Sequence, residues 1–178
     1  MPNGNILVLA WERKTANEAF GIGRQTIENP LNEMWSEAIL ELELVGSNDA
    51  NIVWEWHLWD HLIQDIDPEL PNYGVVADHP ELQDINYGNV GSMSDPLGPN
   101  GDWKHLNSID YNEDLDQIII SSRHHDEIYI IDHSTTIEEA ASSSGGNSGK
   151  GGNYLYRWGN PQTYGRGDEL NHLLSVQH

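Results

Sequence analysis

Apolar residues recur at short, regular intervals along this chain and predict a series of β-strands. The apolar run Ile6–Trp11 follows the turn residues Pro-Asn-Gly-Asn directly. Residues 38–45 alternate strictly, with one alanine and three leucines on the same side, which predicts a strand with one buried face. A further strand is predicted over Ile52–His57, where Trp54 and Trp56 share a side.

The same order of elements begins again in the second half of the chain. Strands are predicted over His105–Tyr111, Gln117–Ser122, Glu127–Asp132 and Tyr154–Trp158, with a polar turn at residues 112–116. Each half therefore contains a turn followed by three strands. The second half has one more strand, which precedes its turn.

The segments between these strands differ in character. Residues 15–35 contain Pro30 and few β-branched residues, and they predict an insertion with about one helical turn. Residues 59–101 form a long polar connection rich in Pro and Gly, and loops of such length are usually functional or incompletely ordered. The Ser/Gly-rich residues 142–152 are expected to be flexible.

A repeat of four short antiparallel strands with variable insertions is typical of β-propeller blades. We therefore predict an all-β chain that forms a partial β-propeller, with about two four-stranded antiparallel blades and long loops. A β-sandwich would use strands of the same kind and stays open as the alternative. Residues 1–58 would be a partial blade, 59–104 a long connection, 105–167 the second blade and 168–178 the start of the next.

Two blades cannot close a ring, which needs roughly four to eight. Their lateral strands would stay unpaired, and unpaired edges attract other strands. We therefore expect the chain to be a fragment of one propeller domain. The alternative is that it associates with other chains, including its own copies, through the open edges.

Charge and composition exclude several classes of partner and site. Asp and Glu number 29 against 8 Lys and Arg, a formal charge of −21, and such a surface repels nucleic acid. We interpret the charge as a solvated acidic surface. No apolar run reaches the ~20 residues of a membrane-spanning helix, so no membrane partner is expected. The absence of Cys excludes disulfides and Cys-based zinc sites.

The repeat itself points to one candidate site. The first strand of a propeller blade lines the central channel, so His105 and His178, which begin successive inner strands, would both face the channel mouth. The turn at residues 112–116 would bring Arg123 back beside His105 and Asn107. A guanidinium suits tetrahedral oxyanions, and Asn and His add donors. These residues predict an oxyanion site, unless Arg123 is a structural residue paired with a carboxylate.

Other candidate motifs do not predict a site. His57 and His61 lack the His-Glu-x-x-His pattern and fall where a strand should end, so no metal site is predicted. His133 has no evident partners for a hydrolytic triad. Residues 145–152 are not a phosphate-binding loop, because the first Gly and the final Ser or Thr of that motif are missing. We predict neither metal nor cofactor.

Several motifs resemble a known family. Residues 102–111, Asp-Trp-Lys-His-Leu-Asn-Ser-Ile-Asp-Tyr, followed by Ile-Ile-Ser-Ser-Arg at 119–123, resemble the core motif of bacterial arylsulfotransferases. Pro-Asn-Gly-Asn-Ile-Leu-Val-Leu-Ala at 2–10, Ile-Val-Trp-Glu-Trp at 52–56 and Tyr-Arg-Trp-Gly-Asn at 156–160 are similar to further motifs of the same family. The resemblance spans nearly the whole chain.

The resemblance implies a six-bladed propeller that transfers a sulfuryl group from a phenolic sulfate ester to a phenol through a sulfohistidine intermediate. His105, Asn107 and Arg123 match the family's sulfate-binding residues, and His178 matches its nucleophile. The small-molecule partners would be an aryl sulfate and a phenol, without a nucleotide sulfate donor.

The family also implies a periplasmic or secreted location. One more channel histidine of the family belongs to a strand before residues 2–5, which this chain lacks, so the chain alone is expected to be inactive or nearly so. The alternative function is a non-catalytic propeller that binds a ligand or a protein.

Overall fold

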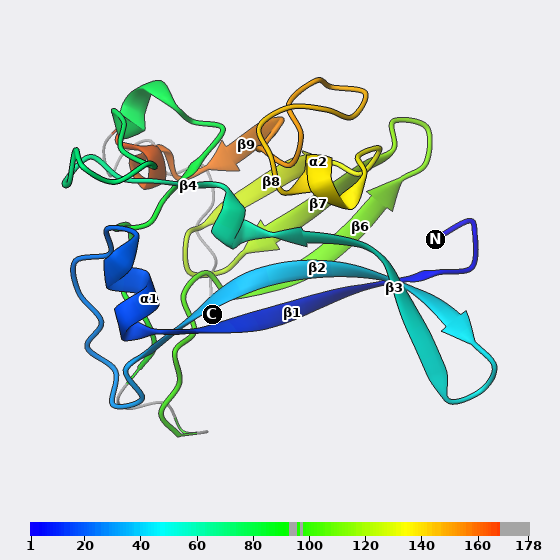
Figure 1. Cartoon of the computed structure of the whole chain (residues 1–178), viewed down its shortest axis with the longest axis horizontal. Coiled ribbons are helices and arrows are strands. Elements are labelled where there is room, and N and C mark those ends of the chain that lie inside the picture. Colours follow the sequence, from blue (N-terminus) through cyan, green and yellow to red (C-terminus); the bar gives the residue numbers. More distant parts are fainter. Residues whose placement is uncertain (93–95, 97, 168–178) are drawn as a thin grey trace.

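The computed structural model describes residues 1–92, 96 and 98–167. The protein is mostly β, with 38% of residues in strands and 12% in helices. Its two larger sheets are antiparallel and lie beside each other, the first blue to cyan and the second green to orange in Figure 1. Among the described residues, no helix has both the length and the apolar character needed to cross a membrane.

The first sheet is a three-stranded meander. It consists of β1 (Ile6–Thr15), β2 (Glu33–Val45) and β3 (Asp49–His57), in that order. Each strand was predicted from the sequence, although all three are longer than expected. The helical turn predicted between them is α1 (Ala16–Gly21), which begins after a capping box formed by Thr15 and Glu18.

The second sheet is a four-stranded meander. Its strands are β6 (Leu106–Asn112), β7 (Gln117–Ser122), β8 (Glu127–Asp132) and β9 (Tyr156–Gly159). The bounds of β7 and β8 are those predicted, and β6 begins one residue after His105. Neither large sheet is closed. The two sheets thus match the predicted order of elements, with a turn and three strands in the first half, and one strand, a turn and three strands in the second.

The connections contain more regular structure than their composition predicted. The long connection holds η1 (Leu58–Asp60), η2 (Val76–Asp78) and two short parallel strands, β4 (Leu62–Ile63) and β5 (Gln83–Asp84). Near the other end of the chain lie α2 (Ile137–Ala140) and η3 (Pro161–Tyr164).

The Ser/Gly-rich loop that we expected to be flexible is closed by backbone hydrogen bonds. The amide of Gly152 donates to the Ser142 carbonyl at 3.0 Å, and that of Gly151 donates to Gly145 at 3.0 Å. The loop is also fastened from outside, because the Ser148 amide donates to Asp132 at 2.8 Å. Composition alone missed these bonds because they depend on the path of the backbone.

The core lies between the two large sheets. Trp54 and Trp56 of β3 are both buried, as their alternation predicted, and they pack with isoleucines of β7 and β8. Their indole N–H groups are also bonded, Trp54 to the Thr135 hydroxyl at 3.0 Å and Trp56 to the Gly152 carbonyl at 2.7 Å. Buried indoles usually find such partners. These two residues therefore connect the first sheet to the segment between β8 and β9 of the second sheet.

The two faces of β2 are not divided as the leucine pattern suggested. Ile39 and Glu41 face the core, whereas Leu44 is 56% exposed. Ile6, Leu42 and Ile52 are cross-strand neighbours on the outer side, and Ile6 and Ile52 are 45% and 50% exposed. The first sheet therefore carries an exposed apolar row on the face that points away from the second sheet.

Candidate functional site

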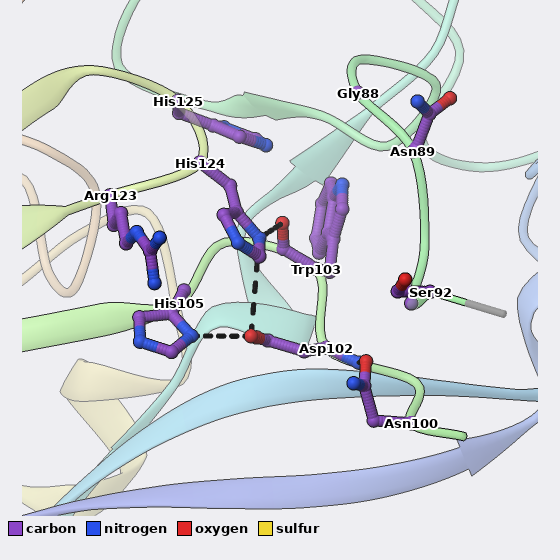
Figure 2. Close-up of a pocket in the computed structure, with 11 residues that line it drawn as sticks. Gly88, Asn89, Ser92, Asn100, Asp102, Trp103, His105, Arg123, His124 and His125 are labelled. Atoms are coloured by element: carbon purple, nitrogen blue, oxygen red, sulfur yellow. Dashed lines mark hydrogen bonds and ion pairs between the residues drawn. The ribbon is translucent and has the colours of Figure 1, made fainter. Parts of the chain in front are cut away.

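A cavity of about 360 Å³ opens beside the start of β6. His105, Arg123 and His124 line it together with Asp102 and Trp103, and Figure 2 shows the Arg123 guanidinium directed toward the His105 imidazole. These residues come from both sides of the β6–β7 hairpin. The structure thus brings His105 and Arg123 to one cavity, as the sequence predicted.

Hydrogen bonds of the hairpin end hold the two residues together. The Arg123 amide donates to the His105 carbonyl at 3.1 Å, and the His124 amide donates to the Lys104 carbonyl at 3.1 Å. The Ser122 hydroxyl also donates to Lys104, at 2.7 Å. His105 itself has φ 52°, a left-handed conformation that non-glycine residues rarely adopt. The imidazole direction is therefore set by a constrained backbone.

Asp102 is a site residue that the sequence analysis missed. Its Oδ2 lies 2.5 Å from His105 Nδ1 and 3.9 Å from His124 Nδ1, as the dashed lines in Figure 2 mark. The Asp102 side chain is only 9% exposed, and its Oδ1 has no hydrogen-bond partner among the described residues. The signal in the sequence was its place three residues before His105, within the resembling motif.

The other two predicted site residues are not shown to join this cavity. A bulge after Leu106 makes Asn107 the extra residue of β6, and its Oδ1 accepts from the Ser121 hydroxyl at 2.7 Å. Asn107 is absent from the part of the cavity lining that is described. His178, the predicted nucleophile, lies outside the described residues, as does the rest of 168–178.

Comparison with protein families identifies the family of the chain. The model of the family described as Arylsulfotransferase (ASST) matches residues 1–157. The chain belongs to the arylsulfotransferase family. Comparison with curated proteins gave no match, and comparison with solved structures gave none either.

An aromatic surface adjoins the site of this arylsulfotransferase-family chain. Trp11 of β1 is 51% exposed, and its ring centroid lies 6.3 Å from that of His105 and 5.3 Å from that of Trp35. Trp103, in contrast, is fully buried, and its indole N–H donates to the Tyr87 carbonyl at 2.8 Å. The exposed indole beside His105 comes from the first sheet, so the sequence repeat did not reveal it.

A buried polar network lies behind the cavity. The Lys104 ammonium is fully enclosed and donates to Gln83 Oε1 at 2.5 Å and to the Tyr129 hydroxyl at 2.7 Å, with His125 Nδ1 at 3.3 Å. Burial lowers the pKa of Lys104 to about 7 and raises the pKa of the nearby Glu37 carboxyl to about 8. These bonds fix the residue that precedes His105.

Asp102, His105 and His124 are also the described residues that best suit a metal ion, because their ligand atoms lie within 4.8 Å of one another. Donors around tetrahedral zinc, with bonds of about 2.0–2.1 Å, would stand about 3.3 Å apart. The 2.5 Å between Asp102 and His105 is too short for two ligands of one ion and corresponds to a short hydrogen bond. We therefore treat these two residues as a hydrogen-bonded pair.

The other histidine pair of the sequence has a structural role. Both ring nitrogens of the buried His61 are bonded, Nδ1 to Asn153 at 2.8 Å and Nε2 to the Ala140 carbonyl at 2.8 Å. His57 ends β3, as predicted, and its Nδ1 lies 3.2 Å from Glu12. These contacts give His61 no ring nitrogen for a metal.

Proposed function

We propose that this chain carries the sulfate-handling residues of an arylsulfotransferase, an enzyme that moves a sulfuryl group from a phenolic sulfate ester to a phenol. The observation that carries the proposal is the convergence of His105 and Arg123 on one cavity. Membership of the family supplies the substrate class. The proposed reaction has two halves, with a sulfohistidine between them.

The residues of the cavity suit this chemistry. A transferring sulfuryl group spreads negative charge over three oxygens, and a guanidinium presents several N–H donors in a fixed plane. Donors aimed at charge that develops in the transition state lower the barrier, as in the related phosphoryl transfers. Arg123 would take this role with His105, and Asn107 would join them by turning away from Ser121.

The nucleophile is proposed to be His178, on the family motif alone. A neutral imidazole is a good nucleophile near pH 7, and attack by its nitrogen on sulfur would release the first phenol. The second phenol would then take the sulfuryl group from the histidine. No nucleotide sulfate donor is required.

Trp11 is the candidate surface for the aryl ring. Its half-exposed indole lies beside His105, where a substrate ring would extend from a sulfate held at the cavity. Aromatic pairs contribute about 0.5–1.5 kcal/mol beyond the area that they bury. This contact would favour aryl over alkyl sulfates.

We further propose that the two large sheets are neighbouring blades of a six-bladed propeller. The exposed apolar row of Ile6, Leu42 and Ile52 supports this, because exposed apolar patches usually mark a surface that another element covers. In that arrangement the blade boundaries would follow the sequence prediction, with residues 1–58 and 105–167 in separate blades. The proposed location, from the family, is periplasmic or secreted.

The first test is anion binding by the chain itself. Inorganic sulfate and 4-nitrophenyl sulfate should shift the NMR resonances of His105 and Arg123. Replacing Arg123→Met should weaken binding about tenfold or more, because hydrogen bonds to charged groups contribute about 1.5–3 kcal/mol. Arg13→Met is the matched control. Arg13 of β1 is exposed and forms an ion pair with Glu33 of β2. Equal binding by both variants would refute the proposal.

The second test is the covalent intermediate, measured on the chain within a complete propeller. Incubation with 4-nitrophenyl sulfate should add the mass of one SO3 group to a histidine, and added phenol should remove it. His178→Ala should abolish the adduct. A protein that binds sulfate but never acquires the adduct would instead be the non-catalytic binding module.

A further inference from the structure

The hydrogen bond between Asp102 and His105 is the shortest polar contact of the cavity that is described. Asp102 Oδ2 lies 2.5 Å from His105 Nδ1. An ionised carboxylate only accepts, so the shared hydrogen belongs to Nδ1 of the imidazole. His124 does not compete for this position, because its Nδ1 bonds the Trp103 carbonyl at 3.2 Å and lies 3.9 Å from Asp102.

The surroundings of Asp102 strengthen this pairing. Its side chain is nine-tenths buried, and its Oδ1 has no partner among the described residues. A buried carboxylate with an unbonded oxygen is costly, and a neighbouring positive charge offsets that cost. Arg123 and His124 line the same cavity, but the group in contact with the carboxylate is His105. Asp102 therefore holds the His105 ring by its Nδ1 atom.

The hydrogen bond also decides which nitrogen is available for chemistry. With Nδ1 held by Asp102, the nitrogen left for chemistry is Nε2, which Figure 2 shows on the part of the ring that points away from Asp102. The His105 side chain is 32% exposed and lines the cavity, so a ligand there can reach the ring. Nε2 would be a proton donor when the ring is charged and a proton acceptor when it is neutral.

We propose that Asp102 is a positioning residue that makes His105 the proton donor to the departing phenol and the proton acceptor from the incoming one. This inference rests on the proposed sulfuryl transfer. In the first half-reaction the sulfur–oxygen bond to the aryl group breaks as the attacking nitrogen bonds sulfur. The proton on Nε2 passes to the aryl oxygen, so that a neutral phenol leaves.

The second half-reaction reverses these events. The acceptor phenol gives its proton to Nε2 while its oxygen bonds sulfur and the sulfur–nitrogen bond breaks. His105 ends each cycle charged, as it began, and no electrons are exchanged with any further reactant. Asp102 keeps its bond to Nδ1 throughout and stabilises the charged ring.

NMR of the chain tests the positioning role without any turnover. Nitrogen chemical shifts of His105 should show hydrogen on Nδ1 in the neutral ring, and Asp102→Asn should shift the population toward hydrogen on Nε2. Asp110→Asn is the control, because it removes the same charge from an exposed position on β6. Hydrogen on Nε2 of the neutral ring in the unaltered chain would overturn the inference.

The leaving group provides the kinetic test, made on the complete propeller. General acid catalysis contributes about 10²–10⁴-fold, and it matters most when the leaving oxygen is basic. Asp102→Asn should therefore slow release of phenol from phenyl sulfate about a hundredfold, but release of nitrophenol less than tenfold. Equal losses for both esters would reduce Asp102 to a structural residue. If the unaltered protein does not bind sulfate at all, the proposed function itself is refuted.

Discussion

Single residues of this chain adopt unusual backbone conformations for different reasons. Four described non-glycine residues have positive φ, namely Asn32, His105, Asp116 and Asp126. Asn and Asp tolerate this region because their short side chains bond locally. The imidazole of His105 bonds the Asp102 side chain rather than the backbone of its own turn. Residues held in sparsely populated regions cluster at functional sites. Its conformation is maintained by the hydrogen bonds that join Lys104 and His105 to β7 and its turn.

Gly152 offers a test of how tightly the Ser/Gly-rich loop is packed. A Cβ there would lie 2.0 Å from the Ala140 carbonyl oxygen and 2.5 Å from His61 Nε2. Gly152→Ala should therefore lower the free energy of unfolding by about 1–3 kcal/mol, because backbone must move to admit the methyl group. Urea unfolding measures this change.

The matched control for that substitution is Gly21→Ala at the end of α1, where a Cβ would meet nothing within 4 Å. This variant should be neutral or slightly more stable, since Ala is about 1 kcal/mol better than Gly in a helix. Equal effects of the two variants would mean that the loop is not packed as described.

At the scale of elements, one ion pair connects the last two strands of the second sheet. Arg157 of β9 donates to both carboxylate oxygens of Glu127 on β8, at 2.9 and 2.6 Å, and both side chains are buried. The Thr163 hydroxyl of η3 donates to the same carboxylate at 2.7 Å. The guanidinium also bonds the carbonyls of Pro80 and Leu82 at 3.1 Å. This pair therefore joins β8 and β9 to the long connection.

Removal of one partner should be far more harmful than removal of both. Arg157→Met would leave the Glu127 carboxylate buried without its cation, and unfolding free energy should fall by about 3–5 kcal/mol. Glu127→Gln combined with Arg157→Met should recover part of that loss, because the buried carboxylate that lacked its guanidinium is then neutral. Additive losses in chemical denaturation would show that the pair acts through separate contacts.

Across the whole molecule, His133 links the two large sheets. Its Nε2 lies 2.9 Å from Glu41 of β2, and its Nδ1 lies 2.7 Å from Asp116 in the turn between β6 and β7. The sequence analysis had found no partners for a hydrolytic triad at this histidine. Burial alone would raise the pKa of Glu41, but hydrogen bonds from Asn3, Asn5 and His133 hold it below its ordinary value.

This link predicts loss of stability in acid. A carboxyl whose pKa is depressed by folding stabilises the protein above its unfolded pKa, and that stability is lost as pH falls through the folded pKa. The unaltered protein should therefore have a higher free energy of unfolding than Glu41→Gln near neutral pH. This difference should shrink as the pH falls below the ordinary pKa of Glu, about 4.3. Thermal unfolding at a series of pH values measures it. A constant difference would exclude the Glu41 charge as its cause.

The sequence by itself determined the local elements and the residues that one hairpin brings together. Strand alternation placed β7 and β8 correctly, and the turn between β6 and β7 was sufficient to bring Arg123 beside His105. These features depend on neighbours along the chain, whose geometry is limited by the period of a strand and the length of a turn.

The tertiary structure decided what lies against those elements. The packing of two sheets placed Glu41 rather than the leucines of β2 on the inner face, enclosed Lys104, and set Trp11 beside His105. Such contacts join residues through a specific path of the backbone, and alternation or spacing carries no information about that path.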